Sequence, residues 1–276
     1  MAQQTSENEN YEAEVFLDRI RGVDQRRPGH CEKHGDFVDV HVSGKNPQVP
    51  KGWDGCPECV RERHEADHEK QLEDEQTRLA RERIENIIRK SGIPKRFRGK
   101  TLDDFKPPTK KAESHLDRVR EYADVVCGDD HDGRCLILLG KVGTGKTHLA
   151  CAVVEQVIRT TGKPCSYWTF SELVMSVKAT FSKNSELGEA DVYQNFAQGR
   201  LAAIDEVGVQ NFTEFEQTVA YEAINARYMA EKPTILATNL EAEDLPECIG
   251  ERAIDRLREG GGRALDFDWK SHRGGA

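Results

Sequence analysis

Residues 140–147 read Gly140-Lys141-Val142-Gly143-Thr144-Gly145-Lys146-Thr147, directly after the apolar run 135–139. The stretch matches the pattern G-x-x-x-x-G-K-[ST], and the apolar residues after it recur at helical spacing. Between a strand and a helix, such glycines turn backbone N–H groups towards phosphate oxygens, and the helix N-terminus adds positive potential. Lys146 can then reach the β- and γ-phosphates, while the Thr147 hydroxyl can ligate Mg²⁺. All eight residues are therefore predicted to bind a nucleoside triphosphate.

A second apolar run, 201–204, ends in two carboxylates, Asp205 and Glu206. Asp205 suits the nucleotide and Mg²⁺ site, and Glu206 can polarise a water molecule that attacks the γ-phosphate. A small-molecule kinase has less need of the second acid. The pair therefore favours an NTPase over a kinase.

Three further polar side chains fit a catalytic role. Asn239 follows the apolar run 234–238, where its amide could orient the attacking water. Arg252 and Arg256 are four residues apart on an expected helix, so they share a face. An arginine supplied to a neighbour's nucleotide stabilises transition-state charge. Ordinary surface arginines are the alternative.

Strands and helices are expected to alternate along the second half of the chain. The expected strands are 135–139, 164–170, 201–204, 234–238 and about 265–269; helices are expected after 147, from Ser171 as cap to about 181, at 212–230 and at 251–258. Such alternation predicts an α/β fold with a mostly parallel sheet and helices on both faces.

A Cys/His pattern near the N-terminus has the spacing of metal ligands. Cys31 and His34 form one tight pair, and Cys56 and Cys59 form a second pair after an intervening stretch of 21 residues. Two such pairs can hold opposite sides of a tetrahedral Zn²⁺, and nothing indicates an open position, so the zinc should be structural. His30, His41 and His64 could compete for the histidine position, but His34 has the better spacing; the other cysteines (Cys127, Cys135, Cys151, Cys165, Cys248) are scattered, as buried reduced cysteines are.

These patterns predict four parts: a flexible N-terminal segment 1–28, a zinc-binding module 29–61, a charged connecting helix 62–92 and an ATPase domain 93–276. The first segment could instead be a helix of about three turns or fold on a partner. The connecting helix should bury a stripe of Ala80, Ile84, Ile87 and Ile88 and end at the Gly and Pro of 91–94. Residues 89–100 hold six basic and no acidic residues, which indicates either a phosphate- or partner-facing edge or a solvated linker.

Composition bears on the partners and the cellular location expected for the protein. The 276 residues include 40 Lys+Arg and 49 Asp+Glu, a net charge of −9, which argues against coating nucleic acid by bulk charge. No apolar run approaches the roughly 18 residues that cross a bilayer, and the acidic start lacks the apolar stretch of a signal peptide. We therefore expect a cytoplasmic protein with no membrane partner.

Taken together, the motifs resemble AAA+ helicase loaders of the DnaC type, especially those of phages and prophages. The similar segments are 91–97, 140–150, 204–210 and 250–257. Asp-Glu-Val-Gly-Val-Gln at 205–210 and Gly-Glu-Arg-Ala-Ile-Asp-Arg at 250–256 are far more specific than the phosphate loop.

The resemblance implies an AAA+ P-loop NTPase core that uses ATP and Mg²⁺ and self-associates through its ATPase domain. It also implies binding to a hexameric, DnaB-type replicative helicase and delivery of that helicase to single-stranded DNA. ATP binding and slow, partner- or DNA-stimulated hydrolysis would be the assembly and release switch.

The resemblance also assigns roles to single residues. By position, Asn239 matches the first sensor, Arg252 the arginine finger and Arg256 a second sensing arginine. Phe181 lies in a helical insertion that faces DNA in the family, where stacking of bases on an aromatic ring tolerates any sequence. Core packing is the alternative for this residue.

Two questions stay open at the level of the sequence: which function the ATPase core serves and what the zinc module does. One rival function is an IstB-type AAA+ partner of a transposase, and another is a zinc-dependent DNA-binding regulator that uses ATP only as a ligand. The zinc module could dock the helicase, contact DNA or support the charged helix, of which docking is favoured by analogy with loaders.

Overall fold

The computed structural model describes residues 21–43, 51–129, 131–182, 184–208, 213–259 and 261–271. The chain divides into two compact units, Met1–Ala80 and Arg81–Ala276. Most of the predicted N-terminal segment, residues 1–20, lies outside the described residues.

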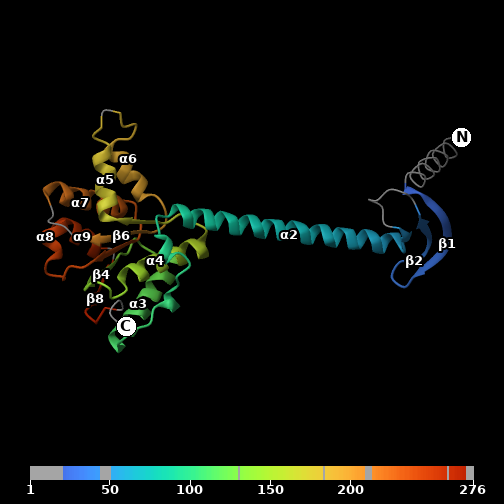
Figure 1. Cartoon of the computed structure of the whole chain (residues 1–276), viewed down its shortest axis with the longest axis horizontal. Coiled ribbons are helices and arrows are strands. Elements are labelled where there is room, and N and C mark those ends of the chain that lie inside the picture. Colours follow the sequence, from blue (N-terminus) through green and yellow to red (C-terminus); the bar gives the residue numbers. More distant parts are fainter. Residues whose placement is uncertain are drawn as a thin grey trace. The chain divides into compact units, whose positions relative to one another are not determined.

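The first unit contains a three-stranded antiparallel sheet in the order β1-β2-β3 (Figure 1). Its strands are β1 (Val23–Cys31), β2 (Gly35–Val42) and β3 (Gly52–Trp53). The predicted boundary at 28/29 therefore falls inside β1. The polar start of this strand carries no apolar alternation, and only its pairing with β2 reveals it as a strand.

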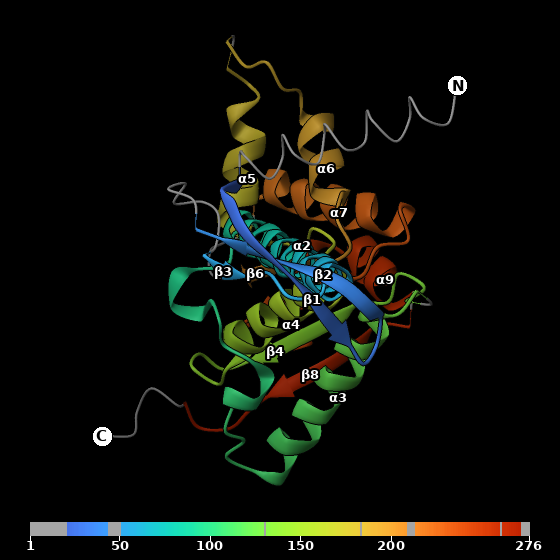
Figure 2. The same ribbon diagram turned by 90° about the vertical axis from the view of Figure 1, so that its right-hand side faces the viewer.

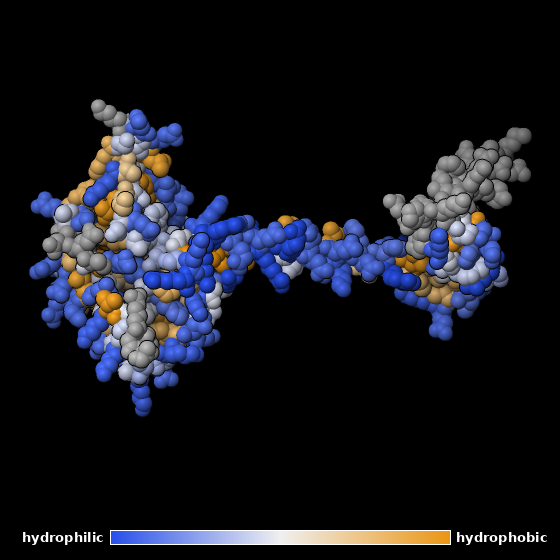
Figure 3. Space-filling model, viewed as in Figure 1, coloured by the Kyte–Doolittle hydropathy of each residue, from blue (hydrophilic) through white to orange (hydrophobic). Residues whose placement is uncertain are grey.

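Helix α2 (Pro57–Lys90) begins five residues before the predicted connecting helix. Proline is favoured in the first turn of a helix because its missing N–H needs no partner there. In the second unit Ile88 is buried, with Ile84 and Ile87 packed against the same core, as predicted. Ala80, the last residue of the first unit, is exposed, so this part of the predicted stripe is wrong. Most of the surface of α2 is hydrophilic (Figure 3).

The second unit is built on a five-stranded parallel sheet in the order β5-β6-β7-β4-β8. Its strands are β4 (Leu136–Gly140), β5 (Ser166–Thr169), β6 (Ala202–Val207), β7 (Thr234–Thr238) and β8 (Arg263–Phe267). The predicted α/β fold with a parallel sheet is confirmed. Each observed strand of this sheet overlaps a predicted one. Strands β4, β6 and β7 contain short, buried apolar runs, and β8 was indicated by the alternation of Leu265, Phe267 and Trp269.

Helices cover both faces of this sheet. They are α3 (Lys110–Cys127), α4 (Lys146–Thr161), α5 (Phe170–Ala179), α6 (Glu189–Ala197), α7 (Glu214–Met229), α8 (Leu245–Ile249) and α9 (Glu251–Glu259). Alternate residues of β4 face opposite ways, so Leu136 and Leu138 pack with α3 and α4, while Ile137 and Leu139 pack with α5 to α9. Figures 1 and 2 show α3 and α4 on one side and α5, α6 and α7 on the other. Among the described residues, no helix has the length and apolar character needed to span a membrane.

The cap of α5 differs from the prediction. Thr169, not Ser171, precedes the helix: its hydroxyl accepts the Glu172 N–H at 3.2 Å, and the Glu172 carboxylate accepts the Thr169 N–H at 2.9 Å. This reciprocal pair of hydrogen bonds is a capping box, and its T-x-x-E sequence pattern predicts the helix start better than a single serine does.

Candidate functional site

The phosphate loop connects β4 to α4 through a sharp turn. Gly145 caps α4 at a φ of +104°, and a Cβ there would lie 2.4 Å from the Phe105 ring. The buried Thr144 hydroxyl donates to the Lys141 carbonyl at 2.8 Å, and the Trp269 indole donates to the Thr144 carbonyl at 3.1 Å. Thr144 therefore shapes the loop with its side chain, and a glycine is required at 145.

Lys146 is buried at the start of α4. Its ammonium donates to the carbonyls of Gly140 and Lys141 at 2.5 and 2.7 Å. Burial lowers the pKa of Lys146 to about 8, and the nearby Asp205 charge offsets only part of this shift. A triphosphate would supply the negative charge that this buried ammonium lacks.

Asp205 and Glu206 lie near the end of β6, and their surroundings differ. The buried Asp205 carboxylate accepts the Glu206 N–H at 2.8 Å through Oδ1 and the Tyr167 hydroxyl at 2.7 Å through Oδ2. Glu206 is exposed and has a φ of +60°, which is uncommon for a residue other than glycine. Neighbours in a straight strand point to opposite faces, but both carboxylates line one cavity here. This local distortion is what allows the two acids to share a site.

Asn239 follows β7 at the same edge of the sheet. Strand β7 pairs directly with β6, which brings Asn239 to the edge of the sheet where Asp205 and Glu206 lie. The Thr238 hydroxyl donates to the Val207 carbonyl at 2.5 Å and accepts the Leu240 N–H at 3.1 Å, which fixes the chain on both sides of Asn239. Its role as an orienter of water stays a prediction.

A cavity of about 510 Å³ brings these groups together. Its lining includes residues from the loop and from both acidic and amide motifs: Val142, Gly143, Gly145, Lys146, Thr147, Asp205, Glu206 and Asn239. This volume is typical of a small-molecule site.

The cavity also has an aromatic part that sequence reasoning missed. Phe97, Phe105 and His148 line it, and the His148 ring lies 6.4 Å from Phe97 and 6.3 Å from Phe105, measured between centroids. Arg96 lines the cavity too and lies over the Phe97 ring at 4.7 Å. The basic run 89–100 was the available signal for this part. The rings offer flat apolar surface to a nucleotide base.

The two predicted arginines of α9 do not line this cavity. Arg252 is exposed, whereas Arg256 pairs with Glu259 at 2.9 Å and lies 4.4 Å over the Tyr228 ring. An arginine finger acts on a neighbour's nucleotide, so exposure suits Arg252. Arg256 is held by its own chain, and its sensing role stays a prediction.

Phe181 lies just beyond α5 and is 61% exposed, which argues against core packing. Its ring meets Phe215 edge-on at 5.8 Å, and Lys178 lies 5.6 Å over the Phe215 ring. Met175 and Leu187 are exposed nearby in sequence, and Figure 3 shows hydrophobic surface around α5 and α6. Contact of Phe181 with DNA stays a prediction.

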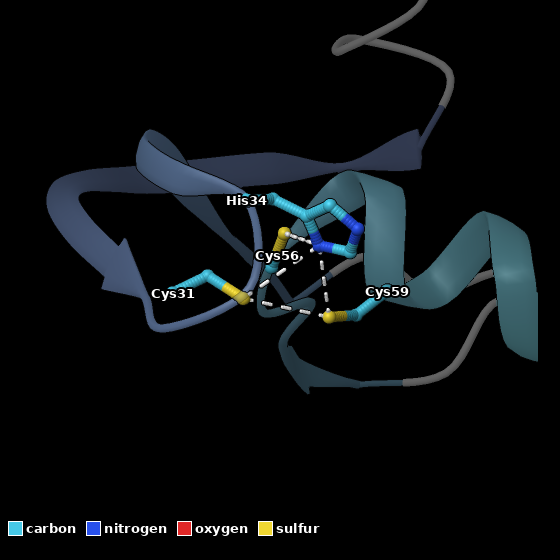
Figure 4. A group of neighbouring side chains, drawn as sticks. All are labelled: Cys31, His34, Cys56 and Cys59. Atoms are coloured by element: carbon cyan, nitrogen blue, oxygen red, sulfur yellow. Dashed lines mark hydrogen bonds between the residues drawn. The ribbon is translucent and has the colours of Figure 1, made fainter.

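Cys31, His34, Cys56 and Cys59 converge in the first unit (Figure 4). The three sulfur atoms lie 3.3–3.7 Å from His34 Nδ1, and the Cys31 and Cys59 sulfurs lie 3.6 Å apart. Tetrahedral zinc with bonds of about 2.0–2.3 Å separates its ligand atoms by roughly 3.5–3.8 Å. The four residues therefore fit a zinc ion.

The thiols of this cluster differ in pKa. Backbone N–H groups of Lys33 and His34 lower the pKa of Cys31, which favours the thiolate that binds metal, whereas the hydrogen bond to Cys31 raises the pKa of Cys59. Glu62 lies 3.2 Å from His34 Nε2 and pairs with Lys33 at 2.6 Å. A carboxylate behind a metal-binding histidine fixes its tautomer, with Nδ1 free for the metal. Sequence reasoning missed Glu62; its place one turn after Cys59 was the only signal.

Comparison with known proteins places the chain among ATP-binding proteins. Residues 64–256, more than half of the chain, match the family described as IstB-like ATP binding protein. The replicative helicase loader DnaC of Escherichia coli (strain K12) is 28% identical over 193 residues, which cover 69% of this chain and 76% of the relative. The protein YdaV of the same strain is 27% identical over 191 residues, which cover 69% of this chain and 75% of YdaV.

Solved structures agree on the fold. The DnaC helicase loader superposes with a TM-score of 0.55 at 21% identity, covering 63% of this chain and 100% of that one. DnaI gives a TM-score of 0.52 at 16% identity over 65% of this chain and 94% of that one. At these identities the likeness establishes the AAA+ fold alone. With the family match, it confirms the predicted resemblance: the chain belongs to the IstB-like ATP-binding protein family and carries a DnaC-like AAA+ domain.

Proposed function

We propose that this protein loads a hexameric, DnaB-type replicative helicase onto single-stranded DNA and uses ATP as its switch. The observation that carries this proposal is the meeting of Lys146, Asp205, Glu206 and Asn239 at one cavity. Such a site suits ATP hydrolysis, and the similarity to DnaC, a replicative helicase loader, indicates the client.

The residues that line the cavity would have different roles in ATP hydrolysis. Lys146 and the loop amides would hold the phosphates, and the Thr147 hydroxyl and Asp205 carboxylate are the hard oxygen ligands that Mg²⁺ prefers. Bound Mg²⁺ would neutralise charge on the phosphate oxygens. Glu206 would take the proton of the attacking water as Asn239 orients it.

Hydrolysis would control assembly through contacts between protomers. Arg252 is exposed on α9, where it can reach a nucleotide held by a neighbour. ATP would then stabilise a self-associated loader on the helicase, and hydrolysis would release it. Slow turnover, stimulated by DNA or helicase, suits this use of ATP.

The zinc module would contribute the helicase-docking surface. Its four ligands fit a closed structural site, with no position left for catalysis. Phe181, exposed and aromatic, would contact single-stranded DNA by stacking.

Co-purification tests this function against its rivals. We expect the protein to retain a DnaB-type replicative helicase in the presence of ATP and Mg²⁺, and to deliver it to single-stranded DNA. Retention of a transposase instead would favour the IstB-type role. Absence of ATP hydrolysis with DNA and helicase present would favour a DNA-binding regulator.

A further inference from the structure

Tyr167 connects two parts of the second unit that sequence reasoning treated separately. It lies on β5 and is buried, and its hydroxyl donates to Asp205 Oδ2 at 2.7 Å. The other oxygen of Asp205 accepts the Glu206 N–H at 2.8 Å.

The backbone of Tyr167 is held from its other side. Strand β5 is an edge strand, and beyond it the Tyr167 N–H donates to the Ser91 carbonyl at 2.6 Å. Gly92 has a φ of +86°, and a Cβ there would lie only 2.2 Å from the Tyr167 carbonyl oxygen. The Ser91 hydroxyl in turn donates to the Ile88 carbonyl of α2 at 2.8 Å. The end of α2 therefore lies directly against β5 at Tyr167.

We propose that Tyr167 is a positioning residue for Asp205, the carboxylate that would bind Mg²⁺, and that the backbone of Ser91–Gly92 holds Tyr167 in place. The terminal torsion of an aspartate is broad, so its plane is set by hydrogen-bond partners rather than by its rotamer. Tyr167 and the Glu206 N–H together fix the plane of Asp205 and the direction of its free lone pairs. This inference rests on the proposed function, because it assigns a role in Mg²⁺–ATP binding.

The substitution Tyr167→Phe tests the hydroxyl while keeping the buried ring. Without the Tyr167 hydroxyl, Asp205 Oδ2 loses its hydrogen-bond donor and the carboxylate can rotate. We expect the affinity for ATP in the absence of Mg²⁺ to be unchanged. Mg²⁺ should tighten ATP binding in the variant as well, but the Mg²⁺ concentration needed for half of this effect should rise about threefold to tenfold. Isothermal titration calorimetry of the full chain at a series of Mg²⁺ concentrations measures both.

A matched control variant tests whether the change in Mg²⁺ dependence is specific to Tyr167 or follows the loss of any buried tyrosine hydroxyl. Tyr122 is buried in the same core, but its hydroxyl only reaches the Arg134 carbonyl, at 3.4 Å. Tyr122→Phe should leave the Mg²⁺ dependence unchanged.

A second pair of variants tests the brace. Gly92→Ala should raise the required Mg²⁺ as Tyr167→Phe does, because the new methyl group displaces the Tyr167 carbonyl. Gly99→Ala is the control: Gly99 also has a positive φ, of +73°, but a Cβ there meets no atom within 4 Å. Gly99→Ala should therefore introduce the same kind of backbone strain as Gly92→Ala but leave the Mg²⁺ concentration required for ATP binding unchanged.

The outcomes separate this inference from the proposed function. Wild-type Mg²⁺ dependence in Tyr167→Phe, or an equal shift in Tyr122→Phe, overturns the positioning role while ATP binding by the wild type stands. Failure of the wild type to bind ATP at all overturns the proposed function, and this inference with it.

Discussion

At the level of single residues, Asp205 and Glu206 are neighbours in sequence with different surroundings. Asp205 is buried and doubly hydrogen-bonded, as a metal ligand should be, whereas Glu206 is exposed to the cavity at a positive φ. The difference supports the proposal that Asp205 holds Mg²⁺ and that Glu206 accepts the proton of the attacking water.

Glu206→Gln should therefore separate ATP binding from hydrolysis. We expect unchanged affinity for Mg²⁺–ATP and a loss of about 10²- to 10⁴-fold in the rate of phosphate release, because the amide cannot accept the proton of water. Glu241→Gln, an exposed acid shortly after Asn239, is the control and should hydrolyse at the wild-type rate. Equal loss of binding and hydrolysis in Glu206→Gln would contradict this assignment.

Lys146 predicts a pH dependence of nucleotide binding. Its pKa of about 8 is lowered by burial, and a bound triphosphate should raise it, so binding takes up a proton above pH 8. ATP affinity should thus fall by up to about tenfold per unit as the pH rises from 8 to 9.5. Calorimetry in two buffers of different ionisation heat detects the proton. Lys110→Met, at an exposed lysine of α3 outside the loop, should keep this proton uptake. Absence of proton uptake by the wild type at pH 9 would count against the prediction.

At the level of secondary-structure elements, the zinc cluster joins the turn between β1 and β2 to the start of α2. The first pair of ligands lies on or beside that turn and the second at the helix N-terminus, with Glu62 one turn further on. The helix thus supplies Cys59 and the carboxylate of Glu62 that contacts His34, while Cys56 lies just before its first residue.

Glu62→Ala should weaken zinc binding by about 10- to 100-fold without removing a ligand. The His34 ring loses the partner that fixes its tautomer, so Nδ1 is less well prepared for metal. Competition with a chromogenic chelator measures the affinity. Glu69→Ala, two turns along the same helix, should match the wild type; the same affinity in Glu62→Ala would show that the contact does not orient the ligand.

Some of these elements were predictable because their signals are local. The phosphate loop and the apolar strands are continuous patterns, and the four Cys/His residues form two pairs that are each close in sequence, so each was located from the sequence. The polar start of β1 was not, because its strand conformation depends on pairing with β2. The Tyr167–Asp205 hydrogen bond was missed for a similar reason: it joins residues 38 positions apart that only the sheet order makes neighbours.

At the level of the whole molecule, the candidate nucleotide cavity and the candidate zinc ligands lie in different units. All residues of the nucleotide cavity fall within Arg81–Ala276, and all four zinc ligands within Met1–Ala80. The two functions should therefore be separable by substitution.

The double variant Cys56→Ser, Cys59→Ser should lose zinc and helicase binding but keep ATP affinity. Without metal the small β-sheet lacks the bonds that supplement its limited core. Metal analysis, calorimetry with ATP and a helicase pull-down measure the three properties. Cys248→Ser, a half-buried cysteine of the second unit, should keep all three. Loss of ATP binding in the double variant would show that the units depend on one another.

The most direct test of the account is the affinity of the full chain for a DnaB-type replicative helicase as a function of nucleotide. We predict tight association with ATP and Mg²⁺, weaker association with ADP, and no response to ATP in Lys146→Ala, whose phosphate-binding ammonium is gone. Helicase binding that is the same with ATP, with ADP and in Lys146→Ala would contradict an ATP-switched loader.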